Sequence, residues 1–407
     1  MNNTATKLWN KNFMMFVMGM EFNLIGSELL KFVLPLYVYL ETGDPLLLGT
    51  VLAISSVPFI VLTPVGGVIA DRINKRKLLG MMNLATAIAI FGYFALAGRI
   101  NIVSATVMMM LVLFAFESMI SPSMEATIPA LVPEGELVKA NSATFLLTTI
   151  SSIGAPIIGG FLLEKSGVTP VLFISITCFL LAGTVKFTTR IPHREQKMTS
   201  SLPATVVNDI KDGIRCITKE KPELGKVILI VTLFGVTLMP SFSALNVLVT
   251  THLEMGETMV GLTRGLIVIG GTVGVMLIGF LGEKANISII RKLLFIASIT
   301  FIPVGLSFMW SSNSTLIYII LVISFFIQLA STTIMGIVNW AYLGEKTPVA
   351  HIGKVYSLAS TFMFLGAAVG NYLYGHLLTH FVETPWIALF IIAGASAIVA
   401  LIAKVKE

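Results

Sequence analysis

Long apolar runs separated by short polar breaks follow one another along the whole chain. Twelve such runs stand out, at about residues 12–40, 46–70, 78–98, 102–128, 139–163, 168–189, 224–250, 258–281, 291–310, 314–340, 353–378 and 385–403. Most match or exceed the roughly 20 residues that a helix needs to cross a bilayer. Only helices satisfy their own backbone hydrogen bonds in lipid within one segment. The pattern therefore predicts an all-α integral membrane protein with twelve transmembrane helices.

The one long polar break lies in the middle of the chain. Within it, Val206, Ile210 and Ile214 recur at helical spacing, opposite Lys211 and Arg215. This spacing is typical of a short amphipathic helix on the inner membrane surface, although a plain tether between two halves would have the same place in the chain. Either interpretation divides the chain into an N-terminal six-helix bundle at 1–190, a cytosolic connector at 191–223 and a C-terminal six-helix bundle at 224–407.

Composition strengthens the membrane prediction. The chain is 56% hydrophobic and 12% charged, with a mean hydropathy of +0.91, whereas a soluble domain carries about 25% charged residues. The net charge of +6 is typical of loop cations in a membrane protein and does not indicate a nucleic-acid partner. The two cysteines have no metal-type spacing, so we expect no metal site and no cofactor.

The placement of cations predicts the topology. With the N-terminus inside, all but four of the 27 Lys and Arg residues fall on the cytosolic side. The four exceptions are Arg99, Lys165 and Arg264, outside or in an outer half, and Lys31, within the first span. So strong an asymmetry predicts a multi-pass protein of the cytoplasmic membrane with both termini cytosolic.

Charged residues inside the first predicted span lie on one helix face. Glu21 and Glu28 are seven residues apart, about 10 Å along the axis at 1.5 Å per residue, and Lys31 can reach Glu28. Charges within a span are costly and usually face a cavity or partner, so these three residues are the predicted proton-coupling site. The positive charge of Lys31 favours the ionised form of Glu28. Glu21, which has no such neighbour in the sequence, is therefore the better proton carrier. The alternatives are a purely structural Glu28–Lys31 pair and a Glu21 in a wet cytosolic vestibule.

Further polar residues lie in other spans. Glu117, near the middle of the fourth span, is either a proton- or cation-binding group or a hydrogen-bonded packing residue. Arg264, in the outer part of the eighth span, could offset a glutamate across the halves or snorkel outward. Neutral polar residues of the second half could orient a ligand or join helices by hydrogen bonds. These are Asn246, Gln328 and Asn339.

The polar loop after the second span carries the most specific motif. It reads Gly67-Val-Ile-Ala-Asp71-Arg72-Ile-Asn74-Lys75-Arg76-Lys77. The loop resembles the signature of the major facilitator superfamily, Gly-x-x-x-Asp-Arg-x-x-basic-basic, although the family usually has glycine where Asn74 stands. Asparagine is the next most tolerant residue in the left-handed conformation, so we expect the turn to be kept. A weaker echo at 279–292 indicates two six-span repeats around a central site.

The resemblance extends to other segments. Residues 34–46, 121–133 and 140–142 are similar to the bacterial macrolide-efflux branch, which includes enterobactin-exporter-like proteins. The fifth span contains a stretch that resembles the antiporter signature of drug exporters, Gly-Pro-x-x-Gly-Gly, with Ala155 in a glycine position. This stretch is Gly154-Ala-Pro156-Ile-Ile-Gly159-Gly160.

The resemblance also implies a gate. In the superfamily this loop holds the cytosolic side closed through a contact with the start of the eleventh span, where the helix N-terminus is positive. That role would fall on Gly67, Asp71, Arg72 and Arg76. The alternative is a topogenic charge cluster without a gating role.

Together these features predict a secondary active transporter that acts as a monomer. We expect proton-coupled efflux (antiport) of an amphipathic small molecule such as a drug or macrolide, cationic ones included, by alternating access. The alternatives are a siderophore or lysophospholipid transporter, an uptake symporter, and a non-transporting receptor or scaffold. No nucleotide loop or nucleophile–base arrangement in the sequence indicates an enzyme.

Overall fold

The computed structural model describes residues 8–133, 135–191, 202–282, 287–348 and 351–403, with only the backbone at 64, 66–72, 202–206 and 281. Its first half comprises α1 (Lys11–Thr42), α2 (Pro45–Ser55), α3 (Val57–Arg72), α4 (Lys75–Leu96), α5 (Ile102–Glu125), α6 (Ile128–Leu131), α7 (Leu137–Ser166) and α8 (Val168–Thr188). The helix α9 (Leu202–Arg215) follows. The second half comprises α10 (Pro222–Thr237), α11 (Ser241–Val247), α12 (Glu257–Leu281), α13 (Ile290–Ile299), α14 (Phe301–Trp310), α15 (Ser314–Lys346), α16 (Ile352–His380) and α17 (Pro385–Ile402).

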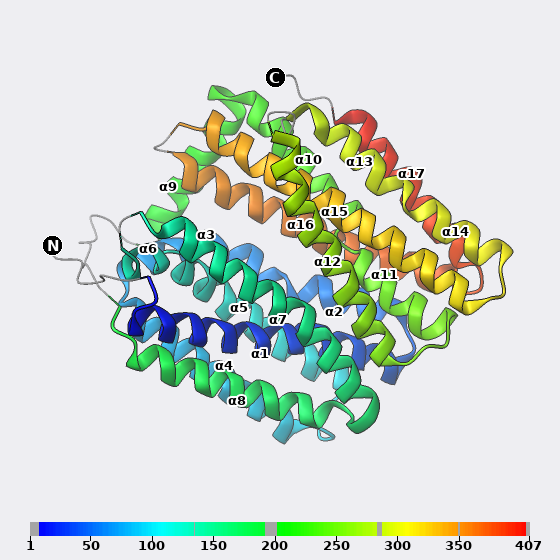
Figure 1. Ribbon diagram of the computed structural model, residues 1–407, viewed down its shortest axis with the longest axis horizontal. Helices are drawn as coiled ribbons and strands as arrows, with labels where there is room; N and C mark the ends of the chain where they lie inside the picture. Colours follow the sequence, from blue (N-terminus) through cyan, green and yellow to red (C-terminus); the bar gives the residue numbers. More distant parts are fainter. Residues whose placement is uncertain (1–7, 134, 192–201, 283–286, 349–350, 404–407) are drawn as a thin grey trace.

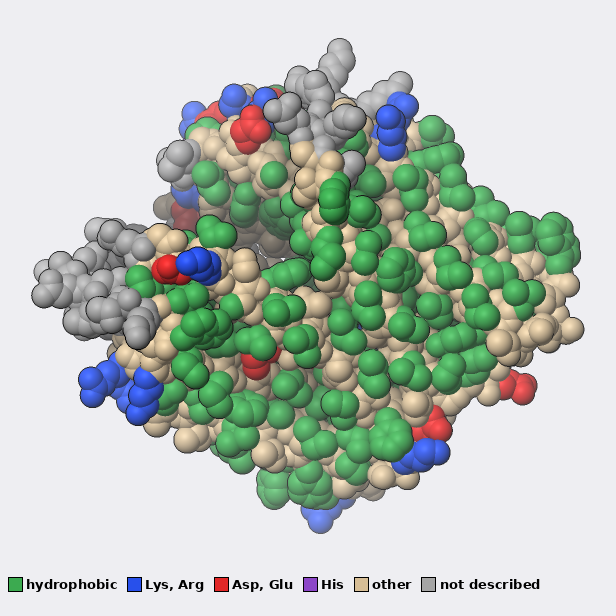
Figure 2. All heavy atoms as spheres, in the orientation of Figure 1, with side chains coloured by type: hydrophobic (Ala, Val, Ile, Leu, Met, Phe, Trp, Pro, Cys, Tyr) green, Lys and Arg blue, Asp and Glu red, His purple; other side chains and the backbone are tan. Residues whose placement is uncertain are grey.

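Twelve helical stretches of the described chain are long and apolar enough to cross a membrane. They coincide with the twelve predicted runs, which confirms the fold class. Two groups of helices, α1–α8 and α10–α17, form two bundles side by side (Figure 1). Hydrophobic side chains cover most of the middle of the face in Figure 2, and most of the charged ones lie near its rims.

Proline divides three of the spans into shorter helices. Pro58, Pro240 and Pro303 lie at or just beyond the breaks between α2 and α3, α10 and α11, and α13 and α14. Proline has no N–H to donate to the preceding turn. At Pro240 the Ser241 N–H bonds to the Leu238 carbonyl, and the Tyr374 hydroxyl donates to the freed Thr237 carbonyl. A neighbouring helix thus satisfies the backbone group, as a lipid environment requires.

The bundles meet closely at the end of the molecule farthest from α9. There α2 packs on α16 and α7 packs on α12. The Leu46 N–H donates to Thr379 Oγ1 at 3.1 Å, and the Thr258 N–H donates to Glu164 Oε2 at 2.9 Å. Gly49 lies so close to α16 that an added Cβ would be 2.3 Å from the Asn371 carbonyl oxygen. This end is therefore closed by direct backbone packing.

The opposite end, where α1 begins, α9 lies and α17 ends, is here called the connector face. A cavity of about 710 Å³ opens there between the bundles, lined by α3, α5, α9, α15 and α16. Its walls include Phe59, Glu125, Trp340, Tyr356 and Phe364. Figure 2 shows a hollow between the bundles near this end. The molecule is thus open at the connector face and closed at the other.

Candidate functional site

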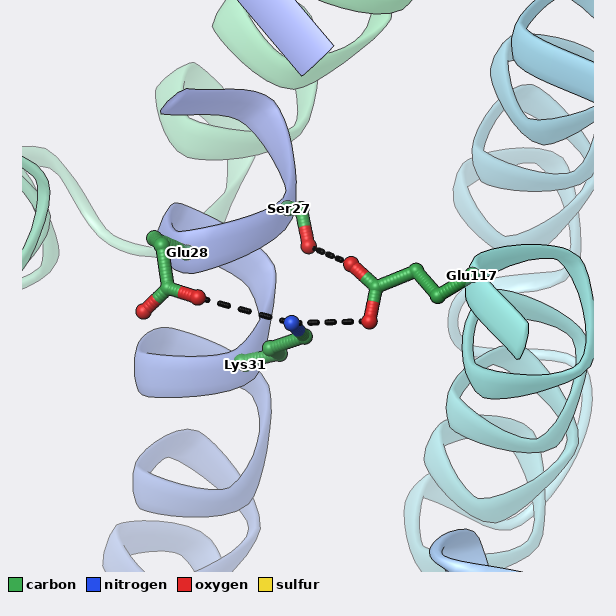
Figure 3. Close-up of polar contacts among 4 residues, drawn as sticks. All are labelled: Ser27, Glu28, Lys31 and Glu117. Carbon is green, nitrogen blue, oxygen red and sulfur yellow. Dashed lines mark hydrogen bonds and ion pairs between the residues drawn. The ribbon is translucent and has the colours of Figure 1, made fainter. Parts of the chain in front are cut away.

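A partly buried ion cluster joins α1 to α5 within the first bundle (Figure 3). Lys31 Nζ lies 2.7 Å from Glu117 Oε2 and 3.4 Å from Glu28 Oε1. The Ser27 hydroxyl donates to the other oxygen of Glu117. The Lys31 amino group also lies 5.6 Å from the centroid of the Phe114 ring. One lysine is therefore shared by two carboxylates from different helices.

Helical spacing explains the α1 side of this cluster. Ser27, Glu28 and Lys31 lie within one turn, so their side chains share a face. The Glu28–Lys31 contact predicted from this spacing is present. The shorter contact, from Lys31 to Glu117, crosses between helices that are 86 residues apart at these positions, and no local pattern in the sequence could reveal it.

Glu21 lies outside this cluster, two turns before Glu28 on α1. It faces α7, where the Ser151 hydroxyl donates to Glu21 Oε2 at 2.7 Å. The other oxygen, Oε1, is buried without a hydrogen-bond partner in the described part of the chain. Two separate carboxylate sites therefore share one helix, and they contact different neighbours.

Arg264 on α12 faces the first bundle. Its guanidinium carbon lies 5.4 Å from the centroid of the Phe32 ring on α1 and 4.8 Å from that of Phe242 on α11. Within the described residues it forms no hydrogen bond and no ion pair, although the charge of Glu28 acts on it from a longer distance. An offset of a glutamate across the halves was one of two alternatives for Arg264, beside snorkelling outward, and among the described residues it is not a direct contact.

The neutral polar residues of the second bundle differ in their partners. Gln328 donates to Ser241 Oγ at 2.8 Å, which joins α15 to α11. Asn246 Oδ1 and both polar side-chain atoms of Asn339 are buried without partners in the described chain. Gln328 thus has a helix-joining role, whereas the two asparagines leave donors and acceptors unused.

The signature loop is described only in part. Only the backbone is described at Gly67, Asp71 and Arg72, and Glu283 and Lys284 of the weaker echo lie outside the described residues. Arg76 Nε donates to the Phe187 carbonyl at 2.6 Å and so joins α4 to α8 at the connector face.

The expectation of a left-handed turn at Asn74 is wrong. Asn74 has a φ of −59° and is the N-cap of α4, with its side chain accepting from the Lys77 N–H at 3.3 Å. An N-cap residue has a negative φ, and its side-chain oxygen accepts a hydrogen bond from the first turn of the helix. The position therefore needs no glycine.

The antiporter-like stretch lies in α7 where the two bundles cross. A Cβ added to Gly160 would be 2.3 Å from the Glu257 carbonyl oxygen of α12, whereas one added to Gly154 would meet nothing within 4 Å. Gly159 faces the side chains of Val33 and Phe32 on α1, and Pro156 is buried. The stretch thus brings α7 close to both α12 and α1.

Lys186 has a position that the hydropathy pattern did not predict. It was grouped with the cytosolic cations, yet its side chain is fully buried between α8 and α1. Its Nζ donates to the Phe16 carbonyl at 2.8 Å and lies 3.4 Å from the Phe16 ring centroid. The only signal in the sequence was its place between Val185 and Phe187, inside an apolar run.

A second contact that was not predicted joins the connector helix to α16. Lys354 Nζ lies 3.1 Å from Asp209 Oδ1 and 2.5 Å from Asp212 Oδ2. The hydrogen bond from Lys354 and its positive charge hold the pKa of Asp212 below its ordinary value. The helix α9 also contacts α3, so it bridges the two bundles over the cavity at the connector face.

Comparisons with known proteins agree with this architecture. The chain is 24% identical over 375 residues to macrolide efflux protein A of Streptococcus pyogenes, covering 89% of this chain and 88% of the relative. It is 24% identical over 361 residues to the enterobactin exporter EntS of Shigella boydii, covering 87% and 82%. A crystal structure of the peptide transporter POT superposes with a TM-score of 0.77 at 14% identity, over 97% of this chain and 93% of that one.

The family model described as Major Facilitator Superfamily matches residues 13–371. This range begins in the first helix and ends in α16, so it covers most of both bundles and the ion cluster between α1 and α5. The chain therefore belongs to the Major Facilitator Superfamily and is a multi-pass membrane transporter.

Proposed function

We propose that the protein is a proton-coupled exporter, an antiporter that moves an amphipathic small molecule by alternating access. The observation that carries this proposal is Lys31, held between Glu117 at 2.7 Å and Glu28 at 3.4 Å. With all three groups ionised, the trio has one unit of excess negative charge, and charge within a membrane is costly. Uptake of one proton by either carboxylate removes the excess and leaves Lys31 paired with the other.

Such a proton transfer would change the packing between helices. Protonation of Glu117 weakens its hold on Lys31, which then pairs with Glu28 on its own helix α1. Phe32, the next residue after Lys31, contacts Arg264 of the second bundle. A change in α1 would therefore reach the interface between the bundles, whose relative movement is the basis of alternating access. Glu21, with one unpartnered oxygen, is a second proton carrier in this scheme.

The cavity at the connector face serves as the entrance for cargo. Its volume of about 710 Å³ falls within the roughly 300–1,000 Å³ typical of small-molecule sites. The cation asymmetry makes this face cytosolic, so the open arrangement is the one that loads from the cytosol. We assign the loop with Gly67, Asp71, Arg72 and Arg76 to a gate at this face, between bundles at 1–190 and 224–407.

The names of the relatives support export as the direction. One is a macrolide efflux protein and the other an enterobactin exporter, and the match to each covers more than four-fifths of both chains. A drug or macrolide is accordingly the first candidate cargo, and a siderophore is the second.

The energetics permit this scheme. One charge moving through 100 mV releases about 2.3 kcal/mol. At about 1.4 kcal/mol per tenfold, one proton per cycle sustains a substrate gradient of roughly fiftyfold.

Reconstitution in proteoliposomes tests the proposal. A set of macrolide, siderophore and dye cargoes is screened under an imposed pH gradient and, separately, an imposed potential. We expect proton-driven export by the unaltered protein and its loss in Glu117→Gln and in Glu21→Gln. The control is Glu136→Gln, which removes a carboxylate at the connector face beyond the ion cluster. Export that persists in both glutamate variants would contradict proton coupling at these residues.

A further inference from the structure

Arg264 is a cation within a membrane helix whose hydrogen-bond donors are unused. A guanidinium has five N–H donors in one plane. The rings of Phe32 and Phe242 lie within 5.4 Å and 4.8 Å of its carbon, and such cation–π contacts are worth about 0.5–2 kcal/mol. They do not satisfy the N–H groups. Within the described residues no acceptor does so either.

The nearby carboxylates are already engaged. Glu28 and Glu117 both contact Lys31, and Ser27 occupies the second oxygen of Glu117. Glu28 attracts Arg264 only from beyond ion-pair distance. Lys31 is therefore paired with two carboxylates, whereas Arg264 contacts none among the described residues, and its positive charge beside two aromatic rings favours a negatively charged ligand. A carboxylate suits it best, because the guanidinium fork binds carboxylates through two parallel hydrogen bonds.

An apolar recess adjoins Arg264. Phe242, whose ring contacts the guanidinium, also lines a cavity of about 140 Å³. Ile267, three residues after Arg264 on α12, lines the same cavity together with Phe325 and Leu329. An engineered apolar cavity of about 150 Å³ holds one benzene molecule, so this recess has room for about one ring or a short alkyl group. At its polar side lie Ser241 and Gln328, which are already hydrogen-bonded to each other.

We propose that Arg264 is the anchor for an anionic group of the cargo and that the recess beside Phe242 takes its apolar part. The cargo is then an amphipathic anion, such as an aryl or alkyl carboxylate, and not an amphipathic cation. The proposal rests on the transporter function argued above, because it specifies the cargo of the same pathway. In this proposal Arg264 binds cargo directly and does not serve only to balance the charge of Glu28.

Binding of three matched probes tests this proposal. The full-length protein, in phosphatidylcholine nanodiscs, is titrated with radiolabelled benzoate in competition with benzamide and benzylammonium. These probes share one ring and differ in charge. We expect benzoate to bind at least tenfold more tightly than the other two. The neutral or the cationic probe binding as tightly as benzoate, or no binding of benzoate, would overturn the proposal without any substitution in the protein.

Variants test the residue itself. Arg264→Gln should weaken benzoate binding at least tenfold, and Arg264→Lys less so, because lysine keeps the charge without the fork. Arg99→Gln, at an exposed loop position, is the matched control and should bind as the unaltered protein does. Unchanged binding in Arg264→Gln would contradict the proposal.

Failure of this proposal is distinguishable from failure of proton-coupled export. Proton-driven export of another cargo without benzoate binding would overturn the anion site alone. Benzoate binding without any proton-driven transport would support the anion site and contradict proton coupling.

Discussion

Lys31 Nζ lies 2.7 Å from Glu117 Oε2, and this ion pair joins α1 to α5 within the first bundle. The side chains of the two residues retain 25% and 14% exposure, so each has lost most of its contact with the surroundings. Glu28 holds the same amino group from the other side at 3.4 Å. Lys31 is thus the one residue on which both carboxylates of the cluster depend.

Removal of Lys31 should destabilise the protein more than removal of Glu117. Lys31→Met leaves Glu28 and Glu117 without their shared counter-ion, which costs about 3–5 kcal/mol in a buried pair. We expect the low end here, because Lys31 keeps a quarter of its exposure. Glu117→Met should cost less, because Lys31 keeps Glu28 as a partner at 3.4 Å. Thermal unfolding of the purified variants measures this, and equal losses in the two variants would contradict it.

The closed end of the molecule should depend on Gly160 and not on Gly154. Gly160→Ala places a Cβ 2.3 Å from the Glu257 carbonyl oxygen and should force α7 away from α12. We expect spin labels at the ends of these helices to show a longer distance, and transport to fall at least tenfold. Gly154→Ala is the matched control, since its Cβ meets nothing within 4 Å. Equal behaviour of the two variants would refute this role.

The contact between α9 and α16 should persist at neutral pH and weaken only in acid. Lys354, by its hydrogen bond and charge, lowers the pKa of Asp212. A depressed carboxyl pKa stabilises the ionised contact above the unfolded value of about 3.9, and this stabilisation is lost as pH falls through the lower folded value. The hydrogen-exchange protection factors in α9, which remove the intrinsic pH dependence of exchange, should therefore be constant from pH 8 to about 5. Asp212→Asn should lower them across this range, and protection factors that fall in the unaltered protein between pH 7 and 6 would contradict the assignment.

The buried amine of Lys186 should matter less for stability than its volume. Lys186→Met keeps the chain length, removes a fully buried cation and loses one hydrogen bond to Phe16. Replacement of buried charge by apolar side chains is often neutral or stabilising, so we expect an unchanged or higher melting temperature. Lys186→Ala should instead cost about 2–5 kcal/mol, as large-to-small core substitutions do.

A surface substitution provides the control for Lys186. Lys226→Met, at an exposed position on α10, should change stability by no more than about 0.5 kcal/mol. A strongly destabilised Lys186→Met beside a normal Lys226→Met would mean that the buried charge itself is required.

Local spacing predicted part of the candidate site correctly. Glu28 and Lys31 are three residues apart on a helix, and their contact follows from helical geometry alone. The start of α4 at Asn74 could also be predicted from the sequence, because asparagine is a favoured N-cap residue. A left-handed turn is the wrong expectation there, because the family's glycine at this position is replaced by a residue whose side chain caps the helix.

The sequence by itself determined the all-α architecture and the number of membrane helices. These depend on the length and hydropathy of each segment, because an apolar segment that crosses lipid must form a helix to satisfy its backbone hydrogen bonds. Only the tertiary structure decided that Lys31 contacts Glu117, that Lys354 contacts Asp209 and Asp212, and that Arg264 lies beside the rings of Phe32 and Phe242. Hydropathy gives no information on which faces of distant helices meet, because lipid-facing and protein-facing surfaces are equally apolar. The signature loop around Asp71 identifies the family, and the packing between the bundles forms the site at which cargo would bind.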